Sequence, residues 1–208
     1  MQTLDAIHAR RSIRKYDPNR PVPRAVLEEI IEASLWAPSG TNRQAWQVVV
    51  ATGEARNELC RLISGTVNHL MTRLQSLPGR VVAATLRFFA DLGGAPCLAL
   101  VFVPKTAAHL DPAMAPQEAA LSEAERLDRV ESASALMQNL CLAAWDKGIG
   151  TCWMLAPRYA AKEIIEYLGL TDVELIAATP LGYPAHVPPG PARRPGRVLW
   201  VGFQEEGE

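Results

Sequence analysis

The sequence predicts a single α+β domain in which a mixed central β-sheet is flanked by helices. Three observations favour this class: apolar residues recur at helical spacing in several segments, short aliphatic runs separate those segments, and no internal repeat or mid-chain linker divides the 208 residues. A chain of this length fits one domain of ordinary size. We therefore expect residues 1–208 to fold as one domain that ends in a C-terminal arm over about 184–208.

The N-terminal third predicts two helices and a strand. Thr3 is expected to cap a short helix that ends where Ser12 begins an extended segment. From Pro23 onward, apolar residues follow helical spacing until Pro38 ends the pattern. The run WQVVVA at 46–51 is bounded by turn residues, so it predicts a buried strand.

The middle of the chain predicts a helical pair, a second strand and a surface excursion. Residues 55–91 are helix-permissive, with breaks near Gly65 and Gly79. The apolar run 97–103 predicts a strand. The proline- and alanine-rich segment 104–116 shows little periodicity, which indicates a loop on the surface.

The last part of the chain predicts the longest helix. Ser122 and Glu125 match a helix-capping pattern, and the apolar side of the helix continues to Gly148. Three shorter elements are expected after it: a short strand within 149–155, a helix over 160–168 and a strand over 174–181.

Composition and charge exclude several classes of partner. The formal net charge is -1, which gives no overall attraction to nucleic acid. Apolar runs such as 97–103 are far shorter than the roughly 20 residues that a membrane helix needs. The N-terminus lacks the apolar stretch of a secretory signal, so we expect a cytoplasmic protein.

Metal and nucleophile motifs are missing from the sequence. The four histidines have no ligand-like spacing, and the chain contains no P-loop, no G-x-S-x-G and no H-E-x-x-H. Gly148 and Gly150 lack the third glycine and the preceding strand of a dinucleotide fingerprint. The cysteines form no C-x-x-C pair and lie in apolar segments, where we interpret them as small apolar residues: Cys60, Cys97, Cys141 and Cys152.

Three segments carry donors that suit an anionic, planar ligand. Arg10, Arg11 and Arg14 surround the hydroxyl of Ser12, a set that suits a phosphate, although a solvated basic stretch is the alternative. The loop 38–44 concentrates small and amide residues, although an ordinary turn has the same composition: Pro38, Ser39, Asn42 and Gln44. The proline-rich tail adds Arg193 and Arg194, either over the same anion or on a solvated linker.

Four motifs, taken in order, resemble the FMN-dependent nitroreductase family. They are RRSIRKYDP near the N-terminus, ASLWAPSGTNRQAW, a long helix ending in GIGTCW, and PLGYPA before a basic tail. The resemblance covers nearly the whole chain and is weakest over 55–130. It implies a nitroreductase-like fold and a homodimer with FMN at the subunit interface, in which the C-terminal arm is exchanged between subunits.

The resemblance also implies roles for single residues. Arg10, Ser12 and Arg14 would hold the FMN phosphate and ribityl chain, with Arg11 nearby and charge added by the tail through Arg193 or Arg194. Asn42 would meet the flavin ring, with Pro38, Ser39 and Gln44 beside it. Backbone groups toward the reactive edge of the ring would come from Trp153, Met154 and Leu155.

The implied activity is hydride transfer from NADH or NADPH through FMN to a small electrophilic acceptor, by a ping-pong mechanism. Because the flavin carries this chemistry, we expect no catalytic side chain and no metal. Leu155 and Ala156 stand where several nitroreductase subgroups carry Glu-Gly, so the acceptor preference is expected to differ from that of those subgroups. Two alternatives stay open: a flavin-binding or flavin-transforming protein without nicotinamide turnover, and a non-enzymatic domain that binds a polyanion.

Overall fold

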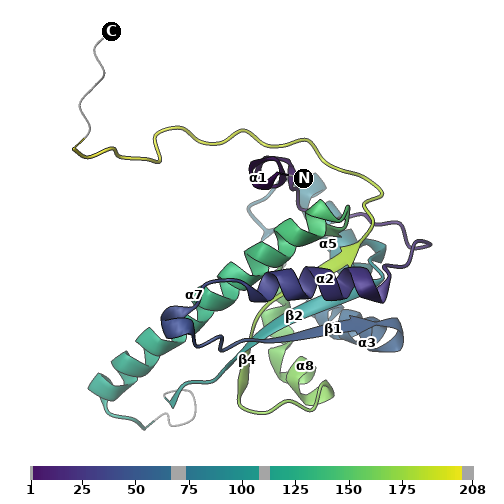
Figure 1. The fold of residues 1–208 in the computed structure, drawn as a ribbon. Coiled ribbons are helices and arrows are strands. Elements are labelled where there is room, and N and C mark those ends of the chain that lie inside the picture. The colour runs from purple at the N-terminus through teal and green to yellow at the C-terminus, as the bar shows by residue number, and fades with distance from the viewer. Residues whose placement is uncertain (1, 67–73, 108–112, 203–208) are drawn as a thin grey trace.

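A β-sheet lies between two layers of helices in the computed structural model of the chain, which describes residues 2–66, 74–107 and 113–202 (Figure 1). The described strands are β1 (Gln47–Thr52), β2 (Cys97–Pro104), β3 (Gly150–Thr151) and β4 (Val173–Gly182). They form one four-stranded sheet in the order β1-β2-β4-β3. This architecture confirms the α+β class.

Helices and short 3-10 turns connect the strands. The helices are α1 (Thr3–Ala9), α2 (Arg24–Leu35), α3 (Gly53–Ser64), α5 (Gly79–Asp91), α7 (Pro116–Asp146) and α8 (Ala161–Tyr167). The 3-10 turns are η1 (Gly40–Asn42), η2 (Leu92–Gly94) and η3 (Ala156–Ala160). Part of the expected helical pair and of the surface excursion, 67–73 and 108–112, lies outside the described residues.

The expectation of a mixed sheet needs correction. All three strand pairings are antiparallel, and the parallel pairing found in the described part of the chain is a single bridge between Ser12 and Thr151. A lone helix between two strands would return the chain parallel. The connection from β1 to β2 contains α3 and α5 and is not a lone crossover helix, and β2 pairs antiparallel with β1.

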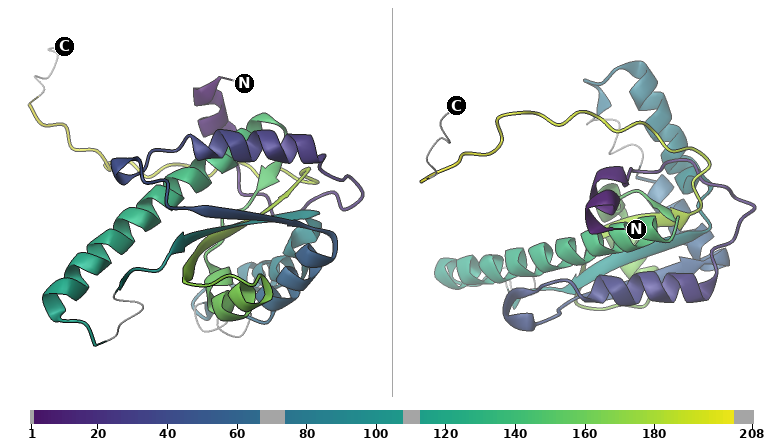
Figure 2. Two further views of the ribbon diagram at one scale, coloured as in Figure 1. Left: turned by 60° about the horizontal axis from the view of Figure 1, so that its bottom comes forward. Right: turned by 45° about the horizontal axis from the view of Figure 1, so that its top comes forward.

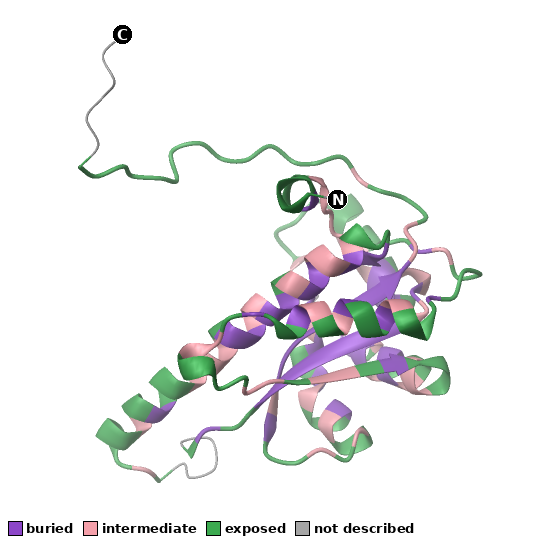
Figure 3. Cartoon of the chain, in the orientation of Figure 1, coloured by how far each residue is buried: buried purple, intermediate pink, exposed green. Residues whose placement is uncertain are grey.

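The core occupies both faces of the sheet. On β2, Leu98, Leu100 and Phe102 pack on the side of α3 and α5, whereas the alternate residues face α2 and α7. This alternation is the ordinary consequence of the two-residue period of a strand. Figure 2 shows α2 and α7 on one side of the sheet and α3, α5 and α8 on the other. Figure 3 shows that β2 and β4 between them are buried, whereas most of the edge strand β1 is half-buried or exposed.

Two expected helix starts are wrong. The long helix α7 begins at Pro116 rather than near Ser122, which is buried inside the helix. Proline is favoured at the first position of a helix, where its missing N–H leaves no bond unmade. Thr3 is the first residue of α1 rather than its cap, and the cap residue Gln2 makes no side-chain capping bond.

The C-terminal arm begins with backbone contacts to the N-terminal segment. Pro184 bridges to Tyr16, and the N–H of Ala185 donates to the carbonyl of Lys15. From there the chain runs past α1 and away from the helices (Figure 1). Its apolar patch 198–201 is exposed, with Leu199 87% exposed. Among the described helices, none combines the length and apolar character needed to cross a membrane.

Candidate functional site

The basic segment after α1 is an extended strand that presents alternate residues to one face. Ile13 is fully buried, and its N–H donates to the carbonyl of Thr151 over 2.8 Å. A side chain at Gly150 would lie 2.7 Å from Ile13 Cγ1, so glycine permits this close approach. Because side chains alternate along a strand, Arg10, Ser12 and Arg14 share the face opposite Ile13.

The three arginines of this segment differ in what they contact. Arg11 donates to the carbonyls of His8 (2.6 Å) and Arg10 (2.8 Å), so its guanidinium closes the end of α1. Within residues 2–66, 74–107 and 113–202, the side chains of Arg10 and Arg14 have no hydrogen-bond or ion-pair partner. Two guanidinium groups beside the Ser12 hydroxyl are therefore available to an anion.

Positive charge extends from this face to the next stretch of chain. Burial raises the pKa of the Cys152 thiol, and the charges of Arg14 and Arg10 oppose that rise. Burial likewise raises the pKa of Tyr16, against the charge of Arg14. The charge of Arg14 thus acts on both Tyr16 and Cys152, and that of Arg10 acts on Cys152, which follows β3.

The stretch 152–155 turns part of its backbone away from the sheet. The N–H of Cys152 donates to Thr179 Oγ1 over 3.0 Å, and Met154 exchanges two backbone hydrogen bonds with Ala178. In an extended chain the intervening N–H groups point the opposite way, so those of Trp153 and Leu155 face away from β4. Trp153 and Leu155 are 36% and 57% exposed. The structure thus joins the basic segment and this stretch, through Thr151.

The turn between α5 and β2 packs against the backbone of Arg14. Tyr16 N–H donates to the carbonyl of Gly93 over 2.9 Å, and a Cβ at Gly93 would meet the carbonyl oxygen of Arg14. Gly93 also has φ +68, in the left-handed region. A residue other than glycine at position 93 would therefore have an unfavourable backbone conformation, and its side chain would have no space.

Gly93→Ala is expected to destabilise the protein by roughly 2 to 4 kcal/mol, because the left-handed backbone and the collision with Arg14 act together. Gly53→Ala is the matched control. Gly53 also has positive φ, +56, but a Cβ there meets nothing within 4 Å. The loss of stability in Gly53→Ala should be about 1 kcal/mol. Denaturant unfolding of both variants measures the difference, and equal losses would contradict the close approach to Arg14.

The loop 38–44 has an unusual backbone. Thr41, Asn42 and Gln44 have φ of 49, 54 and 48, which non-glycine residues rarely adopt. Two hydrogen bonds hold this conformation: Gln44 N–H donates to Ser39 Oγ (3.0 Å), and Gln44 Nε2 donates to Asn42 Oδ1 (3.0 Å). Backbone strain of this kind persists where surrounding contacts enforce it, and it concentrates at binding sites.

Helix α7 holds this loop in place through residues that the sequence motifs did not single out. Gly40 N–H donates to Ser132 Oγ over 3.4 Å, and a Cβ at Gly40 would collide with the carboxylate of Asp128. The only available signal was the placement of Asp128 and Ser132 one helical turn apart on a long helix. By contrast, β3 follows the far end of α7, which lies about 21 Å along the axis from Ser132. The loop and the basic segment are therefore not brought together within one chain.

The tail arginines also stand apart from the basic segment. Arg193 and Arg194 are exposed on the extended arm. The tail passes the basic segment earlier, where a Cβ at Gly190 would meet the guanidinium of Arg11. Across the described part of the chain, no group of three His, Cys, Asp or Glu side chains is placed to hold a metal ion.

Comparisons with known proteins find one family. The model described as the nitroreductase family matches residues 7–183. YfhC of Bacillus subtilis is 30% identical over 198 residues, covering 93% of this chain and 90% of YfhC. An NADH dehydrogenase of Thermus thermophilus is 30% identical over 194 residues, covering 89% and 83%.

Solved structures agree with the sequence comparison. A BluB-like flavoprotein from Clostridium difficile 630 has a TM-score of 0.72 and 27% identity, covering 94% of this chain and 95% of that one. A protein from Desulfovibrio desulfuricans solved in complex with FMN has a TM-score of 0.70 and 25% identity, covering 98% and 99%. The family match over residues 7–183 spans the sheet, the basic segment and the loop 38–44.

Proposed function

The chain belongs to the nitroreductase family, and on that premise we propose that it is an FMN-dependent oxidoreductase. It takes hydride from NADH or NADPH and delivers electrons to a small electrophilic acceptor, by a ping-pong mechanism. It acts as a cytoplasmic homodimer. The observation that carries this proposal is the pair Arg10 and Arg14, which have no partner among the described residues. They lie beside Ser12, which Thr151 joins to a stretch with outward backbone N–H groups.

The donor set of the site fits FMN. A phosphate needs charge-assisted donors, which Arg10 and Arg14 offer beside the Ser12 hydroxyl. The polar edge of the ring needs hydrogen-bond partners, which the backbone of 153–155 and the amide of Asn42 offer. The local backbone around these groups is fixed by Arg11, Pro38, Ser39 and Gln44. Further positive charge comes from the arm, through Arg193 and Arg194.

When bound, FMN supplies the hydride chemistry, so the protein needs no acid or base of its own. The residues of this chain bind the phosphate, orient the ring and leave one of its faces accessible. Leu155 brings no carboxylate to the ring edge, where several subgroups of the family carry Glu. The exposed side chains of Trp153 and Leu155 favour a flat, apolar acceptor such as a quinone, a nitroaromatic compound or an activated alkene.

The purified protein is expected to be yellow and to hold one FMN per subunit. Release by denaturation followed by mass analysis identifies the cofactor, and absorbance gives its stoichiometry. FAD, or no flavin after gentle purification and incubation with FMN, would contradict the proposal. Steady-state oxidation of NADH or NADPH with a quinone separates it from a flavin-binding protein without nicotinamide turnover.

We further propose that the arm of each subunit packs on its partner. A groove of about 840 Å³ lies between α2 and the edge strand β1, lined by apolar residues such as Leu27, Ile31 and Val50. The lining also includes Arg24, Glu28 and Glu32, and Arg24 is paired with Glu28. The arm carries an exposed apolar patch, 198–201, which matches the apolar lining of the groove.

A further inference from the structure

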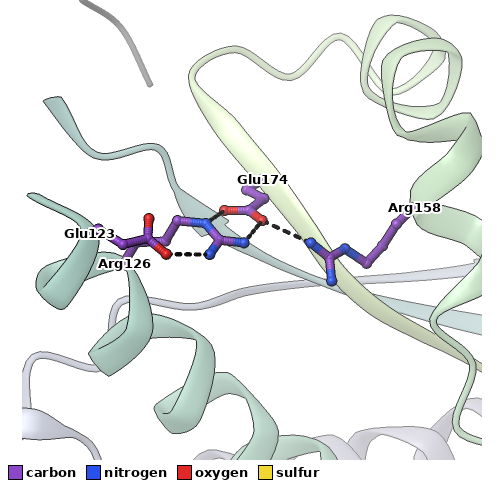
Figure 4. A network of polar contacts seen from close by, with 4 residues as sticks. All are labelled: Glu123, Arg126, Arg158 and Glu174. Atoms are coloured by element: carbon purple, nitrogen blue, oxygen red, sulfur yellow. Dashed lines mark hydrogen bonds and ion pairs between the residues drawn. The ribbon is translucent and has the colours of Figure 1, made fainter. Parts of the chain in front are cut away.

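Arg126 and Glu174 form an ion pair that is not itself assigned to FMN. It links elements that position the residues proposed to contact FMN (Figure 4). Arg126 on α7 is bidentate to Glu174 at the start of β4, with Nε–Oε2 2.9 Å and Nη2–Oε1 2.7 Å. The two side chains are 19% and 17% exposed. Arg126 Nη1 also donates to Glu123 Oε1 over 3.0 Å. Bidentate geometry and partial burial make this pair a firmer cross-link than an exposed ion pair.

Glu174 also reaches the turn that follows the flavin-facing stretch. Arg158 Nη2 donates to Glu174 Oε1 over 3.3 Å, the same oxygen that accepts from Arg126. Arg158 lies in η3, and its N–H donates to the carbonyl of Leu155 over 3.1 Å. One carboxylate oxygen therefore connects α7 to the turn that ends the stretch 153–155.

The same part of α7 holds the loop 38–44. Asp128 and Ser132, which contact Gly40, follow Arg126 within about 9 Å along the helix axis. An α-helix is hydrogen-bonded throughout such a length, so a shift of α7 at Arg126 also shifts Asp128 and Ser132. The ion pair thus sets the position of the loop as well as that of the turn.

We propose that Glu174 is a positioning residue for the flavin site. Its carboxylate fixes the loop 38–44, through α7, relative to the backbone stretch 153–155, through Arg158. The inference rests on the proposed function, which assigns both segments to the flavin ring. Because the loop lies apart from the basic segment within one chain, the two segments of one chain belong to the two flavin sites of the proposed dimer. Loss of the carboxylate leaves both guanidinium groups without their shared partner and lets the two segments move independently.

Glu174→Gln is the direct test, with Glu123→Gln as its matched control. Both changes remove one carboxylate from Arg126, but Glu123 lies on the same helix and joins nothing across the fold. In the FMN-free protein, hydrogen exchange at 38–44 and 153–158 should rise in Glu174→Gln and stay unchanged in Glu123→Gln. The FMN dissociation constant, measured well below the unfolding temperature, should rise about tenfold only in Glu174→Gln.

Two further variants separate positioning from general stability. Arg158→Met cuts the link to the turn and leaves the pair between Arg126 and Glu174 intact. It should raise exchange at 153–158, spare 38–44 and reproduce part of the loss of FMN affinity. Glu174→Asp keeps the charge on a shorter side chain, so it should restore part of the affinity.

The outcomes separate this inference from the proposed function. If Glu174→Gln lowers the melting temperature but leaves exchange at both segments and FMN affinity unchanged, the residue is only structural and the inference is wrong. If the unmodified protein binds no FMN, the proposed function fails, while the exchange comparison still decides whether Glu174 couples the segments. If FMN binds equally to the parent and both glutamine variants, only the inference fails.

Discussion

A chain truncated after Gly190 is expected to be a monomer and to bind FMN at least tenfold more weakly than the full chain. The truncation removes an exposed apolar patch in which Leu199 and Trp200 are 87% and 72% exposed. Burial of each such side chain against a partner contributes about 1.5 to 3 kcal/mol, and the patch contains several. Arg193 and Arg194 are lost with it. Light scattering gives the oligomeric state, and FMN titration of the same samples gives the affinity.

A second truncation, after Gly202, is the matched control because it keeps the arginines and the apolar patch. This shorter cut should leave both the dimer and the FMN affinity unchanged. Val50→Asp then tests the receiving surface, since it places a charge in the groove beside β1 and should also weaken the dimer. A full-length monomer, or a dimer that survives the cut after Gly190, would show that the arm does not pack on a partner.

Much of the fold follows from local patterns in the sequence. The helical spacing after Pro23 and the aliphatic runs at 97–103 and 174–181 correspond to α2, β2 and β4, because each pattern matches the period of one element. Strand direction does not follow from such patterns. It depends on the path of the whole connection between two strands, and part of the connection between β1 and β2 carries no strong periodic signal. The helix start at Ser122 was misplaced because a capping pattern also occurs inside helices.

The part of the candidate site that is formed by residues adjacent in the sequence could be predicted. The cluster from Arg10 to Arg14 is visible as a motif, and its alternation around Ile13 explains why Arg10 and Arg14 share a face while Arg11 does not. The contributions of Asp128 and Glu174 were not predictable. Each acts through contacts with segments far away in the chain, and a single charged residue on a helix reads as a solvated surface.

Arg14→Ala is expected to weaken FMN binding by about ten- to a hundredfold while sparing the fold. Hydrogen bonds to charged groups contribute roughly 1.5 to 3 kcal/mol, and an exposed side chain with no partner among the described residues leaves no buried group unpaired when it is removed. Titration of the FMN-free protein measures the affinity. Quinone reduction driven by NADH or NADPH should fall with the lost flavin and recover when FMN is added in excess.

Two variants test whether the effect of Arg14→Ala comes from a bidentate phosphate contact. Lys15→Ala removes a neighbouring exposed cation that is not assigned to the phosphate, so it should change FMN affinity by less than about threefold. Arg14→Lys keeps the charge but loses the planar fork, so it should restore only part of the affinity. If Arg14→Ala binds FMN as tightly as the parent protein, Arg14 is not a phosphate ligand. If it retains flavin but excess FMN does not restore turnover, its role lies in the reaction itself.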